Sequence, residues 1–102
     1  MSEKIYTIAE IKTILEKILK NMPVYTVILF GSYAKNEADK NSDLDLVIDT
    51  KETLMGFKLY SLITKMEEAF NKSIDAFEKT EIIENSKIDE EIKKTGVIVY
   101  EK

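Results

Sequence analysis

The chain has 102 residues, of which 44% are hydrophobic and 33% charged, with a formal net charge of −4. These values describe one globular domain over residues 1–102, and the acidic balance argues against a general nucleic-acid binder. The chain lacks His, Cys and Arg, which excludes the usual zinc sites, Ser-His-Asp triads and Cys nucleophiles.

The first predicted element is a helix that begins after Thr7. Thr7 and Glu10 have the spacing of a capping box. Apolar residues then recur at helical spacing and form one stripe, comprising Ile8, Ile11, Ile14, Leu15, Ile18, Leu19 and Met22. Asn21 and Pro23 are expected to end this helix. The apolar run over residues 24–30 predicts a first, buried strand.

Gly31 and Ser32 interrupt that strand and precede a short helix predicted over residues 33–38. A small-residue turn before a helix presents free backbone N–H groups, which favour a phosphate. The hydroxyl of Ser32 can also donate a hydrogen bond to a phosphate oxygen. This stretch therefore predicts a phosphate-binding turn.

A second strand is predicted from Asp43 to about residue 49. Alternation places Asp43 and Asp45 on one face, while Leu44, Leu46 and Ile48 point to a core on the other. Two carboxylates beside a phosphate-binding turn suit a hard divalent cation. Taken singly, Asp43 could instead be a capping residue, and Asp45 part of a solvent-facing strand.

The remaining elements are a helix over residues 53–70, a strand over 73–77, weaker helices over 80–83 and 88–94, and a strand over 97–100. The expected buried positions of the long helix are Leu54, Phe57, Leu62, Ile63, Met66 and Phe70. Asp75 points away from the face shared by Ile74 and Ala76, and Gly96 is expected as a helix C′ residue. This order predicts an α/β (α+β) fold with a small mixed sheet flanked by helices.

The stretch from Gly31 to Leu46 resembles the signature of the polymerase β-like nucleotidyltransferase superfamily, in which Gly-Ser is followed by a spacer and Asp-x-Asp. It is most similar to the minimal branch of antitoxin-type partners of HEPN proteins, which commonly reads G-S-x-A-R-G and then S-D-x-D-L. The matching residues are Gly31, Ser32, Ala34, Ser42, Asp43, Asp45 and Leu46. Lys35 stands at the usual Arg position, and Asn36 at the usual Gly position, where Asn tolerates a left-handed backbone.

The resemblance implies an enzyme that moves a nucleoside monophosphate, AMP from ATP, to an acceptor hydroxyl with two Mg²⁺ ions. Gly31 and Ser32 would hold the triphosphate, and Asp43 and Asp45 the metal. Asp75 would be the third carboxylate, which binds metal or takes the acceptor proton. It further implies a HEPN toxin, modified on a tyrosine, as the partner, so that the chain acts as an antitoxin.

Two other functions remain open at this point. The departures at Lys35 and Asn36 favour a non-catalytic antitoxin that neutralises its partner by complex formation. A small-molecule nucleotidyltransferase, such as one acting on aminoglycosides, is a third reading, although those enzymes usually carry an additional helical domain. The absence of Cys and of any apolar run long enough to span a membrane fits a cytoplasmic protein.

Overall fold

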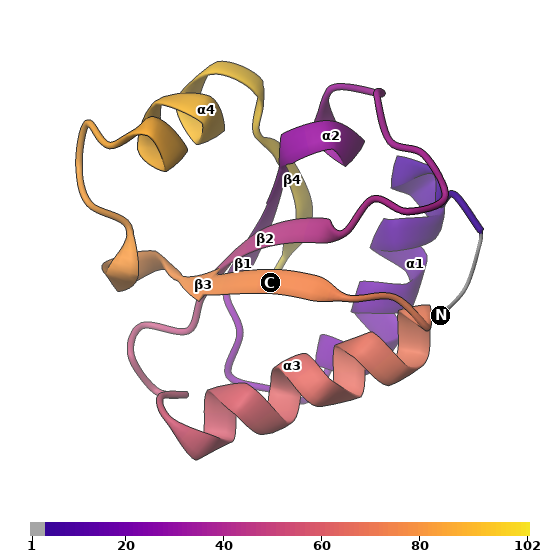
Figure 1. Cartoon of the computed structure of the whole chain (residues 1–102). Coiled ribbons are helices and arrows are strands. Elements are labelled where there is room, and N and C mark those ends of the chain that lie inside the picture. Colours follow the sequence, from indigo (N-terminus) through magenta and orange to yellow (C-terminus); the bar gives the residue numbers. More distant parts are fainter. Residues whose placement is uncertain (1–3) are drawn as a thin grey trace.

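The computed structural model describes residues 4–102, so the first three residues of the predicted domain lie outside the described part. Figure 1 shows the elements in chain order. They are α1 (Ile8–Leu19), β1 (Thr26–Phe30), α2 (Gly31–Ala34), β2 (Leu44–Asp49), α3 (Phe57–Phe70), β3 (Ile74–Glu78), the 3₁₀ helix η1 (Lys79–Glu81), α4 (Lys87–Thr95) and β4 (Val97–Glu101). The predicted fold class is confirmed.

The four strands form one mixed sheet in the order β3-β2-β1-β4. β1 runs antiparallel to both β2 and β4, whereas β2 and β3 are parallel. The parallel pair requires a crossover connection, and α3 supplies it. β3 and β4 are therefore the two edge strands.

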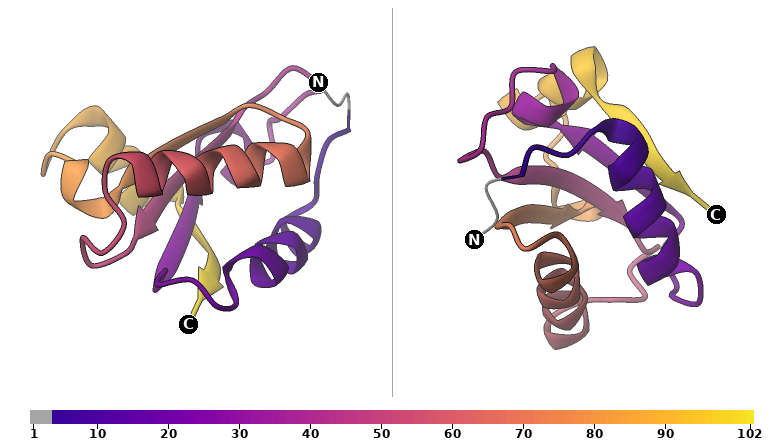
Figure 2. Two further views of the ribbon diagram at one scale, coloured as in Figure 1. Left: turned by 90° about the horizontal axis from the view of Figure 1, so that it is seen from below. Right: turned by 90° about the vertical axis from the view of Figure 1, so that its right-hand side faces the viewer.

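The hydrophobic core lies between one face of the sheet and the helices α1 and α3, while α2 and α4 lie on the opposite side (Figures 1 and 2). Helix α1 begins with the predicted capping box, in which Thr7 and Glu10 exchange hydrogen bonds. It buries Ile11, Leu15 and Leu19 completely. Within residues 4–102, every helix is too short or too polar to cross a membrane.

Helix α3 begins at Phe57, four residues after the predicted start, and this changes which side chains it buries. Its buried residues are Leu59, Leu62, Met66 and Phe70, at helical spacing. Phe57 lies off this stripe and is 90% exposed, so its predicted burial is wrong. Gly96 is the C-cap of α4 with φ −63°, so the predicted left-handed C′ residue is wrong. Glycine is required there for space, because a Cβ would collide with the Ile92 carbonyl.

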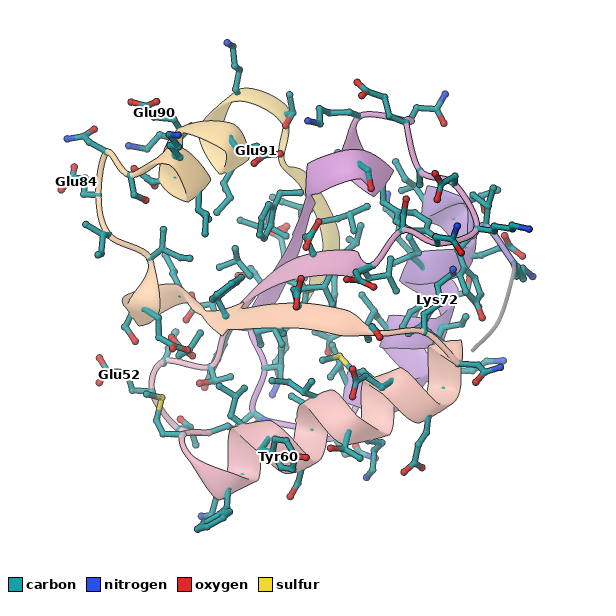
Figure 3. All side chains as sticks on the ribbon, viewed as in Figure 1. Glu52, Tyr60, Lys72, Glu84, Glu90 and Glu91 are labelled. Carbon is teal, nitrogen blue, oxygen red and sulfur yellow. The ribbon has the colours of Figure 1, made fainter. Side chains whose placement is uncertain are left out.

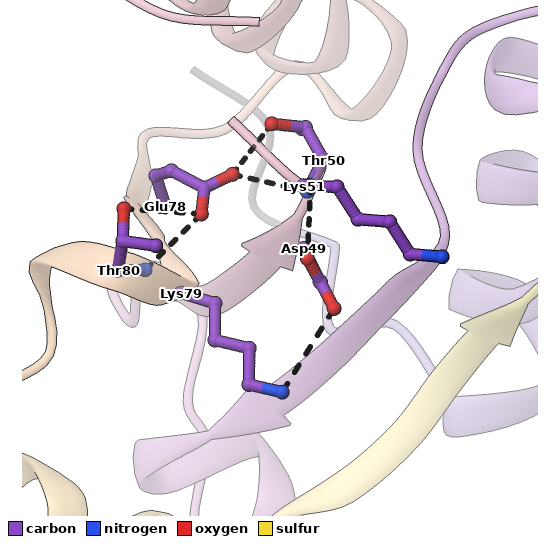
Figure 4. Close-up of polar contacts among 6 residues, drawn as sticks. All are labelled: Asp49, Thr50, Lys51, Glu78, Lys79 and Thr80. Carbon is purple, nitrogen blue, oxygen red and sulfur yellow. Dashed lines mark hydrogen bonds and ion pairs between the residues drawn. The ribbon is translucent and has the colours of Figure 1, made fainter. Parts of the chain in front are cut away.

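A buried carboxylate joins the ends of β2 and β3 (Figure 4). Glu78 is fully buried, and its Oε2 accepts hydrogen bonds from the backbone N–H of Thr50 at 3.0 Å and from the Thr50 hydroxyl at 2.5 Å. Its Oε1 accepts from the N–H of Thr80 at 3.1 Å. Burial acts to raise the pKa of Glu78, but the donors from Thr50 and Thr80 outweigh it and hold the pKa below its ordinary value. The network therefore holds the edge strand β3 against β2.

Replacing Glu78 by Gln should lower the free energy of unfolding at pH 7 by about 1–3 kcal/mol, because the amide group faces donors that need an acceptor. The folded-state pKa of Glu78 is depressed, so its contribution is present above the ordinary value of 4.5 and is lost as pH falls through the folded pKa. The difference in unfolding free energy between wild type and Glu78→Gln should therefore become smaller as the pH is lowered. Urea denaturation at a series of pH values measures it, with exposed Glu84→Gln as the control. Equal unfolding free energies for wild type and Glu78→Gln at pH 7 would contradict the role given to Glu78.

Candidate functional site

The turn after β1 differs from its prediction in one respect. Helix α2 occupies Gly31–Ala34 and not residues 33–38, so Gly31 and Ser32 are its first residues. The short helix ends near Asn36, which has φ 58°, a left-handed conformation that Asn tolerates. Backbone bonds from Lys35 N to Gly31 O at 3.2 Å and from Glu37 N to Ser32 O at 2.9 Å close the turn.

Gly31 lies directly against the carboxylate of Asp45. A Cβ added at Gly31 would collide with this carboxylate, and the backbone of Gly31 has φ 73°, which L side chains rarely adopt. Two independent constraints therefore demand glycine here. The contact joins the two halves of the sequence motif, since the Gly-Ser turn and the second aspartate are in direct contact.

The sheet places the three predicted carboxylates near one another. Asp45 on β2 is the register partner of Phe30 on β1 and of Asp75 on the parallel strand β3. Asp43 immediately precedes β2, two residues before Asp45. Asp45 is half-buried, whereas Asp43 and Asp75 are exposed. Asp75 therefore lies on a strand that pairs alongside the strand of Asp45, as predicted.

These groups shape the protonation of Asp45. Burial, followed by the charges of Asp75, Asp43 and Glu91, raises the pKa of Asp45 from 3.8 to about 6. Asp45 therefore carries uncompensated negative charge beside other carboxylates. A cation bound at this position would relieve that repulsion.

Glu91 is a further acidic residue beside the site that the sequence motif does not include. Figure 3 shows Glu91 on α4 directed toward α2. Its carboxylate lies 3.5 Å from the ammonium of Lys35, just after α2. The helical spacing of Ile88, Glu91 and Ile92 was the available signal, since it places Glu91 on the apolar side of α4.

The donor set suits Mg²⁺, which is usually held by one or two carboxylates together with substrate phosphates. Asp43 and Asp45 provide such a pair of hard oxygen donors. Across residues 4–102, no group of three or more acidic side chains has the arrangement of a metal centre. With two carboxylates as protein ligands, further positions on the ion would be left for phosphate oxygens of a substrate.

Asp45→Asn should make the metal-free protein more stable at pH 7.5. The pKa of Asp45 is raised in the folded state, so stability is lost as pH rises from about 3.8 to about 6, and the Asn variant avoids this loss. Because the side chain is about half exposed, solvent screening limits the gain to about 1 kcal/mol. Urea denaturation in EDTA measures it, with exposed Glu16→Gln as the control. A gain that persists unchanged at pH 3.5 would rule out the ionised carboxylate as its cause.

Comparison with known proteins assigns the fold and the family. Residues 10–102 match the family described as Polymerase beta, Nucleotidyltransferase. The "Putative protein adenylyltransferase MJ1215" of Methanocaldococcus jannaschii is 33% identical over 86 residues, covering 80% of this chain and all of that protein. The "Probable protein adenylyltransferase MntA" of Haemophilus influenzae is 34% identical over 99 residues, covering 93% of this chain and 80% of that protein.

Two solved structures have the same fold at lower identity. One is a toxin–antitoxin crystal structure with AMP-PNP, with a TM-score of 0.71 and 20% identity, covering 89% of this chain and 73% of that chain. The other is a tri-AMPylated Shewanella oneidensis HEPN toxin in complex with an MNT antitoxin, with a TM-score of 0.67 and 17% identity, covering 94% and 74%. Since the family match spans nearly the whole chain and both sequence relatives exceed 30% identity, this chain belongs to the polymerase β nucleotidyltransferase family.

Proposed function

We propose that this chain is a Mg²⁺-dependent protein adenylyltransferase that moves AMP from ATP to a tyrosine hydroxyl of a HEPN toxin and so acts as a cytoplasmic, single-domain antitoxin. The observation that carries this proposal is the contact of Gly31 with Asp45, which in turn pairs with Asp75 across the sheet. The names of the sequence relatives support the activity. The toxin, the AMP-PNP and the AMPylated product in the structural neighbours support the partner and the nucleotide.

Each site residue has one role in this proposal. The backbone of Gly31 and the hydroxyl of Ser32 bind the β- and γ-phosphates of ATP. Asp43 and Asp45 hold Mg²⁺, which when bound neutralises phosphate charge and stabilises the leaving group. Asp75 orients the acceptor hydroxyl and accepts its proton, because it is exposed on the edge strand β3 and is the register partner of Asp45.

The reaction is an in-line displacement. The acceptor oxygen forms a bond to the α-phosphorus, and the bond from this phosphorus to the bridging oxygen breaks. Pyrophosphate departs with that electron pair, and the hydroxyl proton passes to Asp75. The product is a phosphodiester between AMP and the acceptor. No protein nucleophile is needed, which fits a chain without His or Cys.

A second function, a non-catalytic antitoxin, is favoured by one observation. Lys35 forms an ion pair with Glu91 and is not presented to the phosphate turn as an unpaired cation. Lys also lacks the bidentate geometry of the Arg that is common at this position. In this alternative the chain would neutralise its partner by complex formation alone.

Intact-mass measurement of the chain and its toxin partner after incubation with Mg²⁺ and ATP separates the two functions. The partner should gain one or more AMP groups, and Asp43→Asn/Asp45→Asn should reduce the rate by about 10³-fold or more, because the metal-binding pair is lost. Asp49→Asn is the matched control, since Asp49 lies on the same face of the same strand but outside the proposed site. A stable complex in which neither protein gains mass would favour the non-catalytic antitoxin.

A further inference from the structure

An apolar pocket of about 300 Å³ lies where β3, η1 and α4 meet. Phe77 forms its wall on the sheet, Ile82 and Ile83 contribute from the segment after η1, and Lys87 and Ile88 from the start of α4. Ile83 is 75% exposed, so one side of the pocket is open to solvent. None of the roles assigned above uses this pocket.

The pocket lies near the carboxylates of Asp45 and Asp75. Phe77 lies two residues after Asp75 on β3, and alternation places both side chains on the same face. The rings of Phe77 and Phe30 are 6.4 Å apart, and Phe30 is the register partner of Asp45. Lys87 also lines the neighbouring hollow that contains Lys35 and Glu91. The apolar pocket therefore lies on the same face of β3 as Asp75 and shares Lys87 with the hollow that contains Lys35 and Glu91.

The in-line geometry of the proposed reaction places the acceptor on the side of the site where β3 lies. The proposed pyrophosphate leaves from Gly31 and Ser32, at the end of β1. In an in-line displacement the attacking oxygen enters opposite the leaving group. Because β2 lies between β1 and β3, the side opposite β1 is the side of β3 and Asp75. An acceptor placed there extends over Phe77.

The polar residues that line the pocket indicate which kind of AMP-accepting side chain it can bind. Glu81 already accepts a hydrogen bond from the N–H of Glu78 at 2.9 Å, and Ser86 accepts from the N–H of Asp89 at 3.2 Å. Glu81 and Ser86 are engaged in capping, so apart from the ammonium of Lys87 the walls offer mainly apolar contact. A Ser or Thr side chain is too short to fill such a pocket. A phenol ring is long enough to reach its apolar walls and carries its hydroxyl at one end.

We propose that this pocket holds the ring of the acceptor tyrosine and presents its hydroxyl to Asp75. Phe77, Ile82 and Ile88 contact the ring and are specificity-determining residues for a phenolic acceptor. The proposal rests on the proposed function, since it names where the acceptor of that reaction binds.

Filling the pocket tests the proposal by kinetics. Ile82→Trp should raise the KM for the toxin acceptor about 10-fold or more and change the KM for ATP by less than about 2-fold, because only acceptor binding is blocked. Ile5→Trp, at a half-exposed position before α1, is the matched control. The unfolding midpoint of each variant verifies that it folds. A rise in the KM for ATP alone would assign the pocket to the nucleotide and overturn the proposal, as would two unchanged KM values.

A binding measurement tests the pocket independently of AMP transfer. N-acetyl-L-tyrosinamide, added to protein with labelled isoleucine methyl groups, should shift the NMR signals of Ile82 and Ile88 and leave those of Ile5 and Ile98 in place. Absence of these shifts at high millimolar probe overturns the proposal. If the shifts occur while the toxin gains no AMP, the pocket is supported as a phenol site and the proposed catalytic function is the part that fails.

Discussion

The register of three strands is the constraint on which both the core and the site depend. Asp45 lies between Phe30 on β1 and Asp75 on β3, and the same alternation turns Leu44 and Leu46 into the core. A slip of one residue would bury the carboxylates and expose the leucines, so the hydrophobic effect itself holds the acidic groups in position. The same strand pairing buries the core leucines and brings Asp45 and Asp75 together.

The pKa values of two carboxylates, the buried Glu78 and the half-buried Asp45, are shifted in opposite directions. Glu78 accepts hydrogen bonds from N–H and O–H donors, which stabilise its charged form, whereas burial and then the neighbouring acids destabilise the charged form of Asp45. The first joins two strand ends and supports the fold. The second is expected to lower the stability of the metal-free protein, as at a site shaped for a ligand.

The edge strand β3 carries Asp75 and one wall of the apolar pocket, so its position matters for the proposed chemistry. Side-chain carboxylates cap both of its ends, because the N–H of Ile74 donates to Glu67 at 3.0 Å and the N–H of Glu78 donates to Glu81 at 2.9 Å. Edge strands are prone to pair with other chains, and capped N–H groups reduce that tendency. Pairing of another chain along this edge is thereby disfavoured.

Local patterns in the sequence were sufficient for the order of the elements, the capping box at Thr7, the left-handed Asn36 and the strand that carries Asp75, because each depends on a few neighbouring residues. Only the tertiary structure decided the contact of Gly31 with Asp45, the approach of Glu91 to Lys35 and the pocket over Phe77. The start of α3 also escaped prediction, since the burial of Leu59 and the exposure of Phe57 follow from packing against the sheet. Such features depend on strand register and helix docking between residues far apart in the chain, which periodicity within a single segment does not encode.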